Sequence, residues 1–129
     1  GPDTVAVAVE RLDTILAGEI PRLLKIDVEG FEAEVIAGAR RTLADPACAA
    51  VIMELSYHVQ RYGVSEKETE KLLFELGFAP FWYDPFRREL VEVGVPSGTR
   101  WNQIFVRDPE LVHRRVKSAR RYEVHGTRI

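Results

Sequence analysis

LLKIDVEGFE, at residues 23–32, reads as a buried strand that ends in a carboxylate, turns at a glycine and enters a helix. The strand is apolar except at Lys25 until it reaches Asp27, as is typical of a strand covered on both faces. Gly30 suits a tight turn, because glycine adopts a positive φ without strain. Ligand crevices of open α/β sheets lie at the carboxyl ends of such strands, so Asp27 marks a candidate site.

An apolar stripe continues beyond this turn. Phe31, Val35, Ala39 and Leu43 recur every four residues and predict one helix over residues 31–43. Upstream, the alternation VAVAV at residues 5–9 predicts a short strand. A short helix over residues 11–17 is expected to connect that strand to residues 23–27.

The remainder of the chain continues this alternation. Strands are expected over residues 51–55, 78–83, 89–93 and 102–106, with helices over about residues 65–76 and from residue 109. Ser65 and Glu68 form a capping box at the start of the first of these helices. Asp108 and Pro109 are typical of the start of the second. The pattern favours an α/β fold with a mostly parallel sheet, helices on both faces and an antiparallel hairpin near the C-terminus.

Size and composition restrict the function classes. The 129 residues are enough for a single domain over residues 1–129, with a basic helix and tail over residues 109–129. Cys48 is the only cysteine, which excludes an intrachain disulfide and a cysteine-based metal site. The net charge of −2 and the absence of a membrane-length apolar run argue against nucleic-acid and membrane partners. We therefore expect a cytoplasmic protein.

Four segments resemble the second half of FkbM-type S-adenosylmethionine-dependent methyltransferases. They are LLKIDVEGFEAEVIAGARRTL, AVIMELS, LGFAPFWYD and NQIFVRD, and together with VERLDTIL they extend the resemblance over roughly residues 5–108. The resemblance implies a partial Rossmann-like fold and S-adenosylmethionine as the cofactor. It also implies methyl transfer to a hydroxyl of a sugar or other small molecule, as in natural product biosynthesis.

The glycine-rich cofactor loop of that family is absent from this sequence. None of the nine glycines occurs in a GxG pattern. We therefore expect the C-terminal part of a methyltransferase domain, lacking the half that carries the loop and inactive by itself. The alternative is a non-catalytic α/β interaction module. Residues 23–27 would then form an open sheet edge, which invites a homodimer or strand exchange through residues 5–9.

The resemblance places the polar centre of the site at Asp27, which could accept a hydroxyl proton or bind the methionine amine of the cofactor. The alternative interpretation is that Asp27 only caps the following turn. Glu29 projects to the same side if the strand conformation persists, and would join Asp27 in cofactor binding. Glu54 ends the neighbouring strand, where it would need a partner such as Lys25, and could complete an acidic cluster. His58, just beyond, is a candidate general base.

These acidic residues and His58 could also be considered as magnesium ligands. No tight ligand spacing in the sequence supports such a site. The sequence therefore predicts no metal, and the basic residues of 109–129 are interpreted as a solvated helix and a loose tail.

Overall fold

The computed structural model describes residues 3–55, 66–94 and 102–129. Its helices are α1 (Leu12–Ile15), α2 (Glu32–Gly38), α3 (Arg40–Ala44), α4 (Glu66–Glu75) and α5 (Pro109–Ser118). Its strands are β1 (Leu23–Ile26), β2 (Ala50–Glu54), β3 (Ala79–Asp84), β4 (Glu89–Glu92), β5 (Asn102–Val106), β6 (Glu123–Val124) and β7 (Thr127–Arg128). The predicted order of strands and helices from β1 to α5 is confirmed, with one predicted helix divided in two.

Five strands form one sheet in the order β1-β2-β5-β3-β4. Only β1 and β2 pair in parallel, whereas β2–β5, β5–β3 and β3–β4 pair antiparallel. The expectation of a mostly parallel sheet is therefore wrong, although the antiparallel β3–β4 hairpin is confirmed. The physical reason is that β5 lies between β2 and β3 and runs against both, which strand–helix alternation along the chain does not reveal.

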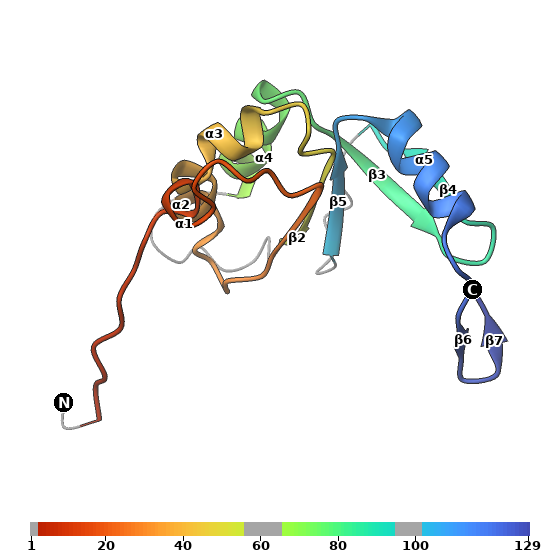
Figure 1. Ribbon diagram of the computed structural model, residues 1–129, viewed down its shortest axis with the longest axis horizontal. Helices are drawn as coiled ribbons and strands as arrows, with labels where there is room; N and C mark the ends of the chain where they lie inside the picture. The colour runs from red at the N-terminus through yellow and green to blue at the C-terminus, as the bar shows by residue number, and fades with distance from the viewer. Residues whose placement is uncertain (1–2, 56–65, 95–101) are drawn as a thin grey trace.

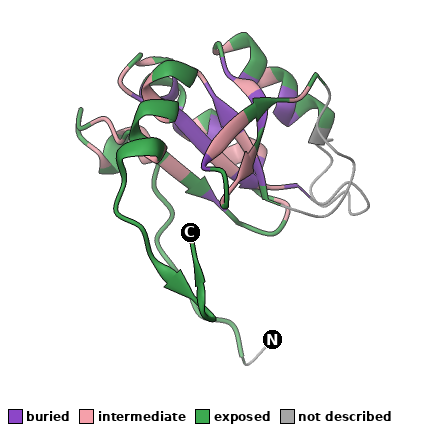
Figure 2. Ribbon diagram, turned by 90° about the vertical axis from the view of Figure 1, so that its right-hand side faces the viewer, coloured by how far each residue is buried: buried purple, intermediate pink, exposed green. Residues whose placement is uncertain are grey.

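Helices cover both faces of this sheet (Figure 1). On one face, α2 and α3 supply Ile36 and Leu43 to the main core, where they join Met53 of β2 and Phe105 of β5. On the opposite face, Val112 of α5 packs against a smaller cluster. Figure 2 shows the buried residues gathered between the sheet and its helices, while both ends of the chain are exposed.

The helix predicted over residues 31–43 is divided into α2 and α3. The break lies at Ala39, whose φ of −119° and ψ of 16° depart from helical values. Asp13 then caps α3 from outside, because its carboxylate accepts hydrogen bonds from the backbone N–H groups of Arg41 (2.9 Å) and Thr42 (2.8 Å). The single-helix prediction is thus wrong because a distant residue supplies the second helix with its own N-terminus.

Arg107, directly after β5, connects the ends of two helices. Its guanidinium donates hydrogen bonds to the carbonyl oxygens of Leu43 and Asp45 at the end of α3, and to that of Leu76 just beyond α4 at 2.8 Å. The guanidinium also lies 4.3 Å from the centre of the Phe78 ring. One side chain therefore satisfies terminal carbonyls that have no partner within their own helices.

The two ends of the chain differ from expectation. Residues 5–9 are extended but belong to neither sheet, so the predicted strand is not formed within the chain. The expected loose tail contains the β6–β7 hairpin, whose turn has a positive φ at His125 and Gly126. Among the described residues, we find no helix that is long and apolar enough to cross a membrane.

Candidate functional site

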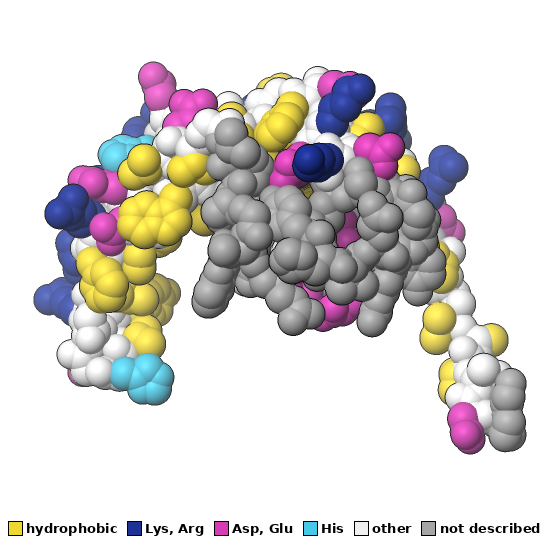
Figure 3. Space-filling view, turned by 180° about the vertical axis from the view of Figure 1, so that it is seen from behind, with side chains coloured by type: hydrophobic (Ala, Val, Ile, Leu, Met, Phe, Trp, Pro, Cys, Tyr) yellow, Lys and Arg dark blue, Asp and Glu magenta, His cyan; other side chains and the backbone are white. Residues whose placement is uncertain are grey.

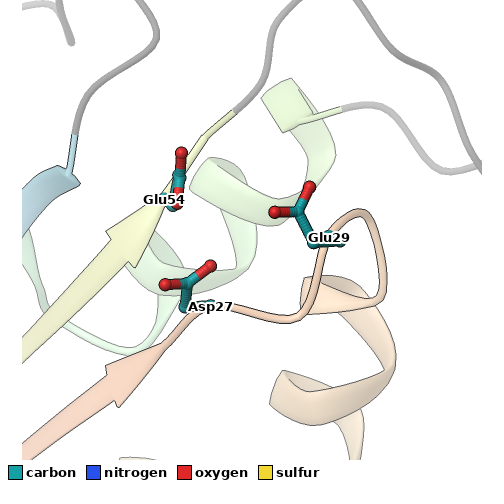
Figure 4. A group of neighbouring side chains, drawn as sticks. All are labelled: Asp27, Glu29 and Glu54. Carbon is teal, nitrogen blue, oxygen red and sulfur yellow. The ribbon is translucent and has the colours of Figure 1, made fainter.

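Asp27 and Glu54 lie side by side at one edge of the sheet. Glu54 is the last residue of β2, and Asp27 directly follows β1. The two strands are parallel and pair Ile26 with Met53, so their carboxyl ends bring the next two residues together. Figure 4 shows both side chains leaving the ends of their strands. The sequence prediction that these two acids meet is confirmed.

Glu29 also lies beside Asp27 and Glu54, but a turn places it there rather than the continued strand that was expected. The strand ends at Ile26, and Glu29 has a φ of 52° followed by 100° at Gly30. These left-handed conformations reverse the chain at the turn into α2. Glu32, only 8% exposed, stabilises the turn because its Oε1 accepts a hydrogen bond from the Gly30 N–H at 3.2 Å. An acid in the first turn of a helix is ordinarily explained by the helix dipole, so the sequence does not reveal this contact.

The three carboxylates form a close acidic cluster, Asp27, Glu29 and Glu54. One oxygen from each of them can be chosen so that all lie within 4.8 Å of one another. Lys25 forms an ion pair with this cluster, with its Nζ 2.7 Å from Oδ2 of Asp27. Lys25 or an arginine was considered as a partner of Glu54, and Lys25 pairs with Asp27 instead.

Neighbouring groups shift the pKa values of Asp27 and Glu54 in opposite directions. The Lys25 ammonium donates a hydrogen bond to Asp27 and lowers the pKa of that carboxyl below its usual value. The pKa of Glu54 is raised by its hydrogen bond to Asp27 and by the nearby negative charge of Asp27. Asp27 therefore stays ionised while Glu54 holds a proton more readily than an ordinary glutamate, so the pair can take up or release a proton together.

The acidic cluster is chemically suited to a positively charged or proton-donating ligand. Carboxylate oxygens bind ammonium groups, accept hydroxyl protons and coordinate hard cations such as Mg²⁺. The fold brings the three acids together although their spacing in the sequence does not suggest a metal site. Exposed acidic groups commonly lie this close without an ion, so the cluster alone does not assign a metal.

His58, the remaining predicted site residue, lies outside the residues that the structure describes. Its role as a general base therefore stays a prediction from the sequence.

Comparison with known proteins gives one match. The family model described as the methyltransferase FkbM domain matches residues 1–80, a stretch that includes the whole acidic cluster. No curated protein and no solved structure matches the chain.

Proposed function

Because this chain belongs to the FkbM methyltransferase family, we propose that its acidic cluster takes part in methyl transfer from S-adenosylmethionine to a hydroxyl group of a small molecule. The observation that carries the proposal is the meeting of Asp27, Glu29 and Glu54 at the carboxyl ends of two adjacent parallel strands. Crevices at such ends are the common ligand sites of open α/β sheets.

The direction of the strands supports a Rossmann-like assignment for this part of the sheet. β3 is antiparallel to β5, and β5 is antiparallel to β2, so β1, β2 and β3 run the same way. We propose that these strands form one side of a larger methyltransferase sheet. The hydroxyl acceptor, a role in natural product biosynthesis and a cytoplasmic location rest on the family resemblance.

The donor set of the cluster fits one end of the proposed cofactor. S-adenosylmethionine, when bound, supplies a methyl group on a positively charged sulfur. Its methionine amine is cationic, and the carboxylates of Asp27 and Glu29 offer it two anionic acceptors. A glycine-rich loop for the rest of the cofactor is absent from these 129 residues, so we propose that residues outside this sequence supply it.

The same cluster offers a route for the proton of the acceptor hydroxyl. The Lys25 ammonium keeps Asp27 ionised and therefore able to accept a proton. Glu54 lies beside Asp27 and has a raised pKa, so it can receive that proton in turn. His58 is proposed as an additional base from its position in the sequence, four residues beyond Glu54, the last residue of β2.

Calorimetric titration with S-adenosylhomocysteine tests the proposal directly. We expect micromolar binding to a protein that contains the complete site, and a loss of at least about tenfold in affinity for Asp27→Asn and Glu29→Gln. Glu19→Gln is a matched control, because Glu19 is exposed and lies outside the cluster. For the 129-residue chain by itself, the proposal of an externally supplied loop predicts binding no tighter than millimolar.

Two results would contradict this assignment. Binding that is unchanged by both cluster substitutions would remove Asp27 and Glu29 from the cofactor site. Micromolar binding to the 129-residue chain would show that the site is complete without a glycine-rich loop.

A further inference from the structure

We propose that a groove between α5 and the β3–β4 hairpin binds a small carboxylate whose remaining body is apolar. The groove lies at the opposite end of the described sheet from β1, since the strand order is β1-β2-β5-β3-β4. The proposal is therefore independent of the acidic cluster and of methyl transfer. It rests on the size of the groove, its apolar floor, the way in which α5 is fixed, and the charges at the rim.

The groove has the size of a small-molecule site. Its volume is about 490 Å³. Phe81 of β3 and Leu90 of β4 line it on the sheet side, and residues in the first half of α5 line it on the helix side. Pockets that bind small molecules have volumes of about 300–1,000 Å³, so the groove can hold an organic ligand.

The floor of the groove continues the smaller core cluster to the surface. Phe81 is only 7% exposed and belongs to that cluster, against which Leu90 and Val112 of α5 also pack. An apolar ligand body placed here would remove apolar surface from water. Figure 3 shows hydrophobic side chains beside Lys and Arg side chains at this end of the molecule, on the left of the view.

Helix α5 is fixed at both ends, so the groove is formed before a ligand binds. Asp108 caps the start of the helix. Near the other end, Lys117 Nζ donates a hydrogen bond to the Arg87 carbonyl oxygen at 3.0 Å, and the Arg88 guanidinium donates one to the Ala119 carbonyl oxygen at 2.6 Å. A preformed site loses less conformational entropy on binding than one that must first be ordered.

Three ionisable side chains of α5 line the rim, Glu110, His113 and Arg114. Their spacing of three and four residues places them on the same side of the helix. Within the described residues, neither Glu110 nor Arg114 forms an ion pair. The Arg114 guanidinium presents a planar fork of N–H donors that matches the two oxygens of a carboxylate. His113 adds an imidazole N–H donor.

The charge around the groove favours an anion with a single negative charge. Residues 109–129 contain six Lys and Arg residues but only two Glu residues. The groove also borders the first turn of α5, where the helix dipole is positive. Glu110 opposes a second negative charge, and a phosphate monoester carries about −1.5 to −2 at pH 7. We therefore assign a carboxylate to the groove.

The test is a titration of the 129-residue chain, monitored by NMR, with three probes that share a naphthalene ring. They are 2-naphthoate, 2-naphthamide and 2-naphthylmethylamine, which differ in the charge of the head group. We expect 2-naphthoate to bind with a Kd on the order of 1 mM and to shift the amide signals of Leu90 and His113. The neutral amide and the cationic amine should each bind at least about fivefold more weakly.

Substitutions at the rim separate recognition from general attraction. Arg114→Gln should weaken 2-naphthoate binding by at least about fivefold and leave 2-naphthamide binding unchanged. Glu110→Gln should strengthen 2-naphthoate binding, because it removes a like charge. Arg115→Gln is the matched control, because Arg115 lies on the same helix but does not line the groove. All three side chains are exposed, so the substitutions leave the fold intact.

Four outcomes would overturn the proposal. Equal binding of the three probes would show that the carboxylate is not recognised. An equal loss for Arg114→Gln and Arg115→Gln would show general attraction to a basic surface. Signal shifts that spare Phe81, Leu90 and α5 would place the binding elsewhere. The absence of any shift at tens of millimolar 2-naphthoate would exclude the site.

Discussion

Glu54 and Asp27 meet at the ends of two adjacent parallel strands, and hydrogen bonding to Asp27 together with its negative charge raises the pKa of Glu54. Lys25, on the other side of Asp27, lowers the pKa of Asp27. The chain thus places an easily ionised acid beside one that resists ionisation. Such divergence between neighbouring carboxyls is typical of groups that transfer protons.

Glu54→Gln should stabilise the protein near neutral pH. A raised pKa in the folded state means that folding favours the protonated form of Glu54. Its stabilising contribution is present below the ordinary value of 4.5 and is lost as pH rises through the folded pKa. Glutamine imitates the protonated form, so urea unfolding should show an advantage near neutral pH that disappears in acid. An advantage of the same size for Glu19→Gln, or one that persists in acid, would contradict this explanation.

Much of the fold could be predicted because its signals are local. β1 follows from its apolar run, and the start of α5 follows from Asp108, whose side chain accepts a hydrogen bond from the Leu111 N–H at 2.9 Å. The division of the helix at Ala39 could not be predicted, because the cap comes from Asp13, about 28 residues away in the sequence. The place of β5 between β2 and β3 is likewise a long-range pairing without a local pattern.

The candidate site shows the same division between local and long-range information. Asp27 and Glu54 were predictable as neighbours, because each lies at the end of an apolar strand. Glu29 joins the acidic cluster because its backbone is left-handed, and the sequence does not predict this conformation for an acidic residue. Glu32 holds the turn through a hydrogen bond to Gly30, and ordinary helix-dipole reasoning accounts for its position without revealing that contact.

Asp13→Ala should destabilise the protein by about 1–2 kcal/mol, the usual cost of losing a helix cap. The substitution removes acceptors for the Arg41 and Thr42 N–H groups and for the Thr42 hydroxyl. Thermal or urea unfolding measures the loss, with Thr14→Ala on the exposed side of α1 as the control. Equal stability of the two variants would show that the cap does not contribute.

The Asp13 cap of α3 also predicts that the protein loses stability in acid. Burial opposes ionisation of Asp13, but the hydrogen bonds from Thr42 and Arg41 lower its pKa overall below the ordinary value of 3.8. Its stabilising effect should be present above that value and be lost as pH falls through the lower, folded pKa. Asp13→Asn should therefore unfold with a weaker dependence on acid than the unchanged protein. An unchanged acid dependence would contradict the role given to Asp13.

Arg107→Lys should destabilise the protein by about 2–3 kcal/mol although the charge is kept. A lysine ammonium cannot reproduce the planar fork that reaches carbonyl groups of Leu43, Asp45 and Leu76 together. Arg120→Lys is the control, since Arg120 is exposed and lies 5.8 Å from the Tyr122 ring. Chemical denaturation of both variants measures the difference, and a comparable small loss in each would show that Arg107 acts only through its charge.

Gly30→Ala should disturb both stability and the acidic cluster. Gly30 has a φ of 100°, a conformation that residues with a Cβ rarely adopt, so the expected loss is about 1–3 kcal/mol. Relaxation of this strain would shift the turn and move Glu29, while Asp27 stays at the end of β1 and Glu54 stays on β2. We therefore expect weaker S-adenosylhomocysteine binding to a protein that contains the complete proposed site, together with a lower unfolding free energy. Gly94→Ala is the control, because Gly94 is outside the positive-φ region and has open space around the added methyl group. Strain at Gly30 would be disproved by equal stability of the two variants, whereas a stability loss with unchanged binding would show that the position of Glu29 does not matter for the cofactor.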